Sequence, residues 1–306
     1  MKIMVFDVGG TEIKYSVMDE QMHRTNSGAV PTPQDTQAQF LDAVYRLYAP
    51  HKDEVSGIAM ALPGFVDNRT GYVSNGGALL YNTATPVGQL LTEKCSCPVI
   101  LENDGKAAAM AELANGALKD CCNAAVFIIG TGVGGGIIAN GQLVRGVHFT
   151  AGEYSFVNTN AEAWDAPDQN MACQCSTSNL LKWYRARKAL PENAPLNGRS
   201  FFAAANAGEP EALEVLRRFC HAVAVQIYNL TVLLDVEKVA IGGGISKQPL
   251  LLESLRSAYD GLYASRAGQA YMEGLPRCQI VPCAFSSEAN QVGVAAAYFE
   301  AMQKKC

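Results

Sequence analysis

Three glycine-rich turns follow apolar runs in the sequence, and each could hold phosphate groups. The turns are Gly9-Gly10-Thr11, Gly130-Thr131-Gly132 with the glycines 134–136 behind it, and Gly242-Gly243-Gly244. Successive backbone N–H groups in such turns form concave sites that bind anions. A tight turn without a ligand explains any one of them equally well. Three such turns in one chain favour a protein that binds a polyphosphate.

The residues around the first two turns predict hairpins, not nucleotide loops of the Walker or Rossmann type. Residues 3–8 and 13–17 are typical of two strands joined by a tight turn, and residues 126–138 repeat this pattern. A Walker loop and a dinucleotide loop both lead directly into a helix, whose N-terminus binds the phosphates. Residues 130–135 match G-x-G-x-x-G formally, but a hairpin pattern follows them. We therefore reject both motifs.

Two aspartates are candidates for chemistry. Asp104 follows the apolar run 98–103 and opens an alanine-rich helix. Its carboxylate could accept the proton of an attacking hydroxyl, as the catalytic aspartate of protein kinases does, although a helix N-cap is the simpler interpretation. Asp7 lies in an otherwise apolar strand, where a charge is costly unless it is paired. Beside a phosphate-binding turn, Mg²⁺ or its water shell is the natural partner of Asp7.

The composition excludes several classes of protein. The chain has 306 residues, of which 49% are hydrophobic and 17% are charged, and this predicts a globular protein of two domains. A formal net charge of −5 without a basic run argues against nucleic-acid binding. With a strand from residue 2 and no apolar run of roughly 18 residues, we expect no signal peptide and no membrane span. The ten cysteines are then expected as reduced thiols of a cytoplasmic protein.

Predicted strands and helices alternate along the chain, which indicates an α/β fold. Strands are predicted at residues 57–62, 98–103, 238–244 and 279–285. Helices are predicted at residues 36–48, from Asp104 to about Leu118, and at residues 209–234, 249–263 and 288–302. Residues 153–207 show no clear periodicity, and we predict an irregular segment there.

Five segments together resemble the ROK family of bacterial sugar kinases, in the family's order and over nearly the whole chain. They are DVGGTEIK (7–14), LPGFVD (62–67), ENDGKAAAMAE (102–112), GTGVGGG (130–136) and AIGGGIS (240–246). The resemblance implies the two-lobe, ribonuclease-H-like α/β fold of actin, hexokinase and Hsp70, with an inter-lobe cleft for substrates. It implies a small lobe of residues 1–114 and 290–306 and a large lobe of residues 115–289. ROK repressors carry an N-terminal DNA-binding domain that this sequence does not show, so we expect a kinase.

The resemblance also implies the site. ATP with Mg²⁺ would donate phosphate to the 6-hydroxyl of a sugar or glycoside, with Asp104 as the general base. The sugar would contact Gly64, Asn103, Asp104 and Glu153. On the nucleotide side, Gly9, Gly10, Thr11, Lys14, Thr131 and Gly132 would hold phosphates, Asp7 would bind Mg²⁺ through water, and Gly243 and Gly244 would lie beside the adenosine. Relatives are often homodimers, and we expect a homodimer.

The chain departs from the family pattern at two places. The family's E-x-G-H becomes Glu153-Tyr154-Ser155-Phe156, so that a histidine typical of sugar and zinc binding is replaced by Phe156. The zinc segment C-x-C-G-x-x-G-C-x-E becomes CQCSTSNLLK (173–182), which keeps Cys173 and Cys175 but has Leu180 and Lys182 at the third Cys and the Glu positions. Two thiolates are too few for a structural zinc site, so we expect none. Similar S-T-S segments occur in zinc-less members that look like β-glucoside kinases, which makes a β-glucoside the expected substrate.

Several alternatives stay open. Free glucose or N-acetylmannosamine could be the acceptor in place of a β-glucoside. The two lost sugar-binding positions are also consistent with a non-catalytic, sugar-binding regulator of the same fold. An actin- or Hsp70-like ATPase is a third class, against which the sugar-type segments 62–67 and 102–104 argue. Retention of Asp7, Asp104 and both phosphate turns favours the kinase.

Overall fold

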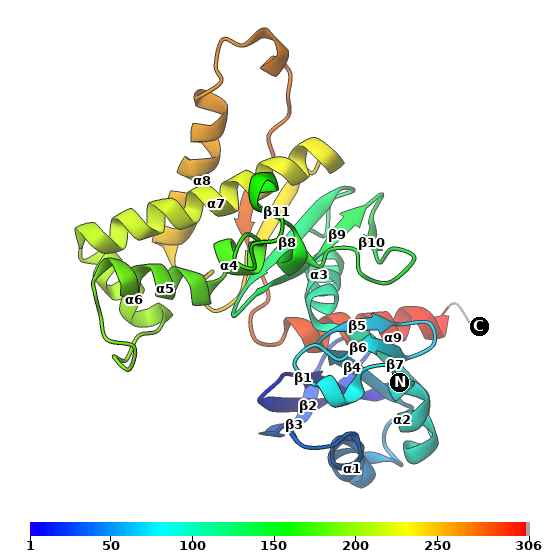
Figure 1. The fold of residues 1–306 in the computed structure, drawn as a ribbon. Coiled ribbons are helices and arrows are strands. Elements are labelled where there is room, and N and C mark those ends of the chain that lie inside the picture. The colour runs from blue at the N-terminus through cyan, green and yellow to red at the C-terminus, as the bar shows by residue number, and fades with distance from the viewer. Residues whose placement is uncertain (304–306) are drawn as a thin grey trace. The chain divides into compact units, whose positions relative to one another are not determined.

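The chain forms two compact units. The computed structural model describes residues 1–303, and Figure 1 shows their fold. The first unit contains Met1–Gly116, Leu143–Ala151 and the chain from Ser287 onward, and the second contains Ala117–Gln142 and Gly152–Ser286. The lobe boundaries implied by the family resemblance stay a prediction. The last three residues of the predicted small lobe, including Cys306, lie outside the described residues.

A mixed five-stranded sheet is the centre of the first unit. Its order is β3-β2-β1-β4-β7, in which β3, β2 and β1 are antiparallel and β1, β4 and β7 are parallel. The strands are β1 (Lys2–Val8), β2 (Glu12–Asp19), β3 (Arg24–Pro31), β4 (Ile58–Leu62) and β7 (Val99–Asn103). The other elements are α1 (Gln37–Tyr48), η1 (Ala49–His51), a small hairpin of β5 (Phe65–Asp67) and β6 (Tyr72–Asn75), η2 (Leu80–Asn82), α2 (Val87–Cys95), α3 (Asp104–Asn115) and α9 (Ala289–Gln303).

The apolar runs of the sequence become the buried strands of this sheet. All side chains of β4, and all those of β1 from Ile3 on, are buried, as in strands covered on both faces. Helix α1 begins after the N-cap Thr36, whose side chain accepts a hydrogen bond from the Gln39 backbone, and buries Phe40 and Val44. The helix predicted at residues 36–48 is confirmed.

The second unit contains four strands of a second five-stranded sheet, β9, β8, β11 and β12, and Gln142 of the fifth strand, β10. The order of this sheet is β10-β9-β8-β11-β12, with β8 and β9 antiparallel and β8, β11 and β12 parallel. The strands are β8 (Ala124–Ile129), β9 (Val133–Ala139), β10 (Gln142–Val144), β11 (Lys238–Gly242) and β12 (Gln279–Pro282). The helices are η3 (Tyr154–Phe156), η4 (Ala161–Ala163), α4 (Met171–Cys175), α5 (Thr177–Arg187), α6 (Gly198–Asn206), α7 (Pro210–Leu234), α8 (Pro249–Ala264) and η5 (Ala270–Met272).

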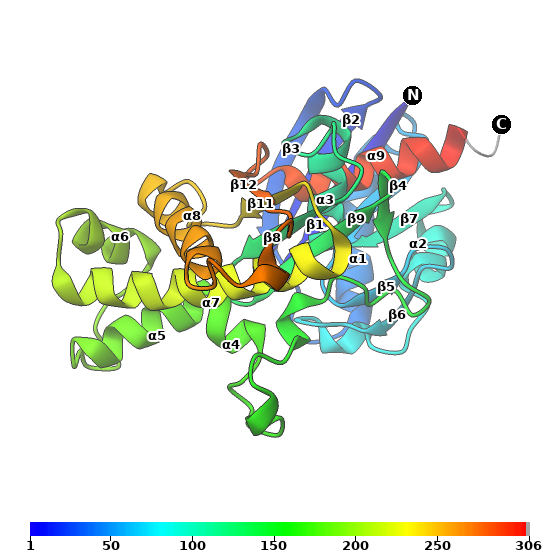
Figure 2. The same cartoon turned by 90° about the horizontal axis from the view of Figure 1, so that it is seen from above.

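The long helix α7 organises the helical part of this unit. It lies beside α5, α6 and α8, as both views of the ribbon show (Figures 1 and 2). Phe219, Val223 and Ile227 are buried along it and belong to the same core as Phe127 of β8. Among the described helices, none has both the length and the apolar character that crossing a membrane requires.

The prediction of an irregular segment at residues 153–207 is wrong, because α4, α5 and α6 lie there. These helices are 5, 11 and 9 residues long, too short for a strong periodic pattern. Each begins at a polar cap, Asn170, Ser176 or Asn197, whose side chain accepts a backbone hydrogen bond.

Three predicted ends also need correction. The helix from Asp104 ends at Asn115 and not near Leu118, because Gly116 follows and weakens helix formation. The strand predicted at residues 238–244 ends at Gly242, and the strand at residues 279–285 ends at Pro282. After Gly242 the chain leaves the strand at Gly243, whose φ is +95°.

Candidate active site

The first glycine turn is the connection between the antiparallel strands β1 and β2, so the predicted hairpin is confirmed. Its three carbonyl groups accept hydrogen bonds from residues that follow β3. Thr32 donates through Oγ1 to the Gly9 carbonyl (2.8 Å) and through its backbone N–H to the Thr11 carbonyl (2.9 Å). Gln34 donates through Nε2 to the Gly10 carbonyl (2.8 Å). Thr32 and Gln34 therefore hold the turn in place through its carbonyl groups, and the sequence of the turn itself does not predict these contacts.

Asp7 lies just before this turn and is buried, with 8% of its surface exposed. It pairs across the ladder with Lys14, whose Nζ is 3.8 Å from Asp7 Oδ2. From α9, Asn290 Nδ2 donates to Asp7 Oδ1 (2.8 Å). Burial raises the pKa of the Asp7 carboxyl, and the Asn290 hydrogen bond and the Lys14 charge offset part of that rise. A bound cation would stabilise this carboxylate further, which fits the predicted Mg²⁺ site.

Three of the residues predicted to bind sugar lie together at the start of α3. Asn103 is the N-cap, and its Oδ1 accepts a hydrogen bond from the Lys106 backbone (3.0 Å). Its Nδ2 donates to the Gly64 carbonyl (2.9 Å). Asp104 is the first residue of the helix, and its Oδ1 accepts from the Gly105 N–H (2.7 Å). The interpretation of Asp104 as the N-cap is therefore wrong, because Asn103 occupies that position.

Gly64 is required by the backbone itself. Its φ is +95°, and a Cβ on this residue would lie 2.0 Å from the Asn75 carbonyl oxygen. No other residue type fits without displacing β6. The Gly64 carbonyl is thereby aimed at Asn103, so the glycine positions the loop that precedes β5.

A buried ion pair supports the start of α3. Glu102 is 1% exposed, and its Oε2 accepts a hydrogen bond from Arg145 Nε (2.8 Å) and forms an ion pair with Arg145 Nη2 (2.8 Å). Its Oε1 accepts from the Asn103 backbone N–H (3.1 Å). Arg145 belongs to the segment Leu143–Ala151 of the first unit. Through Glu102, this segment therefore helps to position Asn103, the residue that caps α3.

In the second unit, the second glycine turn connects β8 and β9, so this predicted hairpin is also confirmed. The segment that carries Glu153 is attached to it. The Ser155 hydroxyl accepts from the Val133 N–H (3.0 Å) and lies 3.1 Å from the Val133 carbonyl. The buried Tyr154 hydroxyl donates to the Gly136 carbonyl (3.1 Å). Glu153 is thus held beside the turn that contains Thr131 and Gly132.

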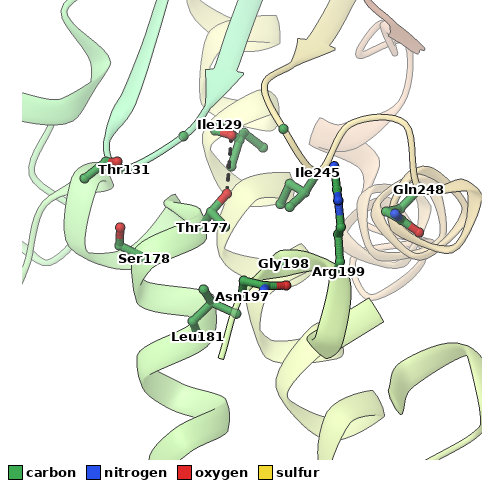
Figure 3. Close-up of a pocket in the computed structure, with 12 residues that line it drawn as sticks. Ile129, Thr131, Thr177, Ser178, Leu181, Asn197, Gly198, Arg199, Ile245 and Gln248 are labelled. Atoms are coloured by element: carbon green, nitrogen blue, oxygen red, sulfur yellow. Dashed lines mark hydrogen bonds between the residues drawn. The ribbon is translucent and has the colours of Figure 1, made fainter. Parts of the chain in front are cut away.

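The second and third glycine turns meet at one cavity, shown in Figure 3. Its volume is about 580 Å³, and Gly130, Thr131, Gly244 and Ile245 are among the residues that line it. The Thr177 hydroxyl donates to the Ile129 carbonyl (3.3 Å), which ties α5 to the end of β8. Gly243 is not among the lining residues. Its φ is +95° and a Cβ would lie 2.1 Å from the Ile129 carbonyl oxygen, so it brings the two turns together.

The comparisons with known proteins agree with this arrangement. The model of the ROK family matches residues 3–303. The chain belongs to the ROK family. It is 30% identical over 258 residues to the beta-glucoside kinase of Listeria innocua serovar 6a, an alignment that covers 84% of this chain and 87% of the relative.

Two solved ROK structures are similar over almost their full length. The ROK family protein from Streptococcus pneumoniae TIGR4 in complex with sucrose has a TM-score of 0.87 at 27% identity, covering 99% of this chain and 100% of that one. The ROK family glucokinase from Streptomyces griseus in complex with glucose and AMPPNP has a TM-score of 0.79 at 25% identity, covering 97% and 99%. These similarities confirm the predicted α/β fold of the actin and hexokinase type.

The ROK zinc segment keeps only two of its cysteines here, Cys173 and Cys175, and two thiolates fall short of the four ligands of a structural zinc site. Cys175 is buried, which raises the pKa of its thiol to about 12. The Cys173 thiol lies 3.6 Å from the Pro167 carbonyl oxygen. Within residues 1–303, no cluster of three or more His, Cys, Asp or Glu side chains is arranged to hold a metal ion. The residues present here do not fit the zinc site typical of the family.

We predict that the buried ion pair contributes strongly to stability. Arg145→Met removes the guanidinium that contacts the buried Glu102 carboxylate, and we expect a loss of about 3–5 kcal/mol in the free energy of unfolding, measured by urea titration. Arg187→Met is the matched control, because its ion pair with Glu214 has the same length, 2.8 Å, but both partners are exposed. That variant should lose about 0–1 kcal/mol. Equal losses for the two variants would contradict the role of Arg145.

We predict that Asp7 destabilises the metal-free protein at neutral pH. Because its folded-state pKa is raised, its contribution to stability is lost as the pH rises through that pKa and is regained toward pH 3.9, the ordinary pKa of aspartate. Asp7→Asn should therefore raise the melting temperature at pH 7, and the difference from the parent should shrink as the pH falls toward 4. The exposed Asp35→Asn serves as control. A lower melting temperature of Asp7→Asn at pH 7 would show that the charge is stabilising.

Proposed function

We propose that this protein is an ATP-dependent sugar kinase that phosphorylates a hexose or β-glucoside at its 6-hydroxyl, with Asp104 as the general base. The observation that carries the proposal is the cavity of the second unit, which both the Thr131 turn and the Gly244 turn line. Its volume of about 580 Å³ suits a nucleotide, since ligand pockets commonly enclose roughly 300–1,000 Å³. Named relatives are sugar kinases, among them a glucokinase from Halalkalibacterium halodurans at 29% identity.

On the donor side, the glycine turns supply backbone N–H groups and the Thr131 hydroxyl for the phosphates of ATP. Lys14 adds a positive charge beside the first turn. Mg²⁺, held by Asp7 through water, would neutralise phosphate charge as it does in other phosphoryl transfers. Asn290 and Lys14 orient the Asp7 carboxylate for that contact.

On the acceptor side, Asp104 receives the proton of the attacking hydroxyl. The sugar oxygen forms a bond to the γ-phosphorus while the bond from the γ-phosphorus to the β-γ bridging oxygen breaks, and ADP leaves. Asp104 is the first residue of α3, and its Oδ1 accepts from the Gly105 N–H, which fixes the carboxylate at the start of the helix. Asn103 and Glu153 orient the sugar hydroxyls. Because phosphoryl transfer depends on positioning, the capped and anchored start of α3 is suited to this role.

A β-glucoside is the acceptor that we favour. Phe156, which replaces a sugar-binding histidine of the family, is 70% exposed three residues after Glu153. An exposed aromatic ring offers an apolar face to the substituent on the anomeric carbon. Relatives named beta-glucoside kinase occur in Listeria innocua and Klebsiella pneumoniae, each 30% identical over 84% of this chain.

A coupled assay of ADP release with a panel of sugars tests the function. We expect ADP release that depends on the sugar. In Asp104→Asn we expect the turnover number to fall by at least about 100-fold with unchanged ATP binding, because a general base contributes that much. Asp53→Asn, an exposed aspartate of the same unit, should behave like the parent. Release without any sugar would indicate an ATPase, and no release would indicate a binding protein. Near-parental turnover of Asp104→Asn would remove Asp104 from the mechanism.

Comparison of cellobiose with glucose tests the substrate class. We expect the parent to prefer cellobiose, and Phe156→Ala to lower kcat/KM for cellobiose by about 5- to 10-fold with little effect on glucose, because only the glycoside reaches the ring. Leu233→Ala, which truncates a side chain that is 76% exposed on α7, should change neither value. If the parent used free glucose as well as cellobiose, the choice of a β-glucoside would be wrong.

A further inference from the structure

The cavity of the second unit has a single charged lining residue, Arg199. The remaining residues that line it are glycines, aliphatic side chains, hydroxyl side chains and the carboxamides of Asn197 and Gln248. No carboxylate lines the cavity to pair with the guanidinium. The walls therefore combine apolar surface with hydrogen-bond donors and one cation.

The position of Arg199 is unfavourable for the fold alone. It is the second residue of α6, where the positive end of the helix dipole disfavours a cation, and the first turn of α6 contains no acidic residue. Within residues 1–303, its guanidinium has no ion pair or hydrogen bond that would offset this cost. A residue that violates a local preference without structural compensation is a candidate for binding a ligand.

Figure 3 separates the two ends of the cavity. Thr131, on the phosphate-binding turn, lies at one side, whereas Arg199 and Gln248 lie at the opposite side, with Arg199 beside Ile245. We propose that Arg199 contacts the nucleoside of the phosphoryl donor and not its phosphates. This inference rests on the proposed function, which directs the phosphate tail to the Thr131 turn.

The carboxamides support this assignment. Asn197 uses its Oδ1 to accept the Ser200 backbone N–H (3.0 Å) and so caps α6. Gln248 occupies the N-cap position of α8 but makes no capping hydrogen bond with its side chain. Its amide stays available, and a glutamine carboxamide matches the N6 and N7 positions of adenine. The planar guanidinium of Arg199 adds a surface that packs on a purine ring.

Titration calorimetry with adenosine, ADP and tripolyphosphate tests the proposal on the intact chain. Arg199→Gln should weaken binding of adenosine and ADP by about 5- to 30-fold, the range of a cation in contact with a ring. Its affinity for tripolyphosphate should stay within twofold of the parent, which also shows that the variant is folded. The matched control is Arg217→Gln, an exposed arginine on α7 that does not line the cavity, and it should bind all three ligands like the parent.

Each outcome decides the question. Unchanged adenosine and ADP binding in Arg199→Gln would make Arg199 an ordinary surface cation and overturn the proposal. A loss for tripolyphosphate as large as that for ADP would place Arg199 on the phosphates and overturn it too. If the parent itself bound no ADP, the proposed function would fail together with this inference, whereas a parent that binds ADP with an unaffected variant removes the inference alone.

Discussion

A carboxylate that is almost completely buried determines how the first unit is built. Glu102 is 1% exposed, and a buried charge of this kind must be neutralised within the protein. Arg145 neutralises it from a position 43 residues further along the chain. The segment Leu143–Ala151 is consequently part of the first unit although the residues on both sides of it belong to the second. The other oxygen of Glu102 accepts a hydrogen bond from the Asn103 backbone N–H. The carboxylate that Arg145 neutralises therefore also positions the residue that caps α3.

The same unit contains a second buried acid that is less well compensated. Asp7 has one amide donor and a lysine at 3.8 Å, and burial still raises its pKa. The two carboxylates thus differ in how closely a cation approaches them: Arg145 lies 2.8 Å from Glu102, whereas Lys14 lies 3.8 Å from Asp7. A protein optimised for stability alone would neutralise both. Leaving one of them undercompensated, next to a turn built to hold anions, is how a cation site is prepared.

The sequence predicted those features that depend on neighbouring residues. Glycine turns between apolar runs indicated both hairpins, and alternating strands and helices indicated the α/β fold. The structure confirms them. Contacts over long sequence distances were not predictable, because neither Arg145 nor Asn290 differs locally from ordinary helix or loop residues. The polar caps Asn170, Ser176 and Asn197 were visible signals for α4, α5 and α6, but helices this short give no periodicity to support them. As a result, the α6 end of the cavity, including Arg199, was missing from the predicted nucleotide site.

The contact between Asn290 and Asp7 joins residues 283 positions apart, close to the two ends of the described chain. During synthesis on the ribosome, β1 and its glycine turn emerge long before α9. Asp7 therefore stays without its amide partner until Asn290, 283 residues later, has been made. A nascent or prematurely terminated chain contains both glycine hairpins and Asp104 but lacks the helix that orients the Asp7 carboxylate. The order of translation thus delays completion of the proposed metal site until α9 has been made.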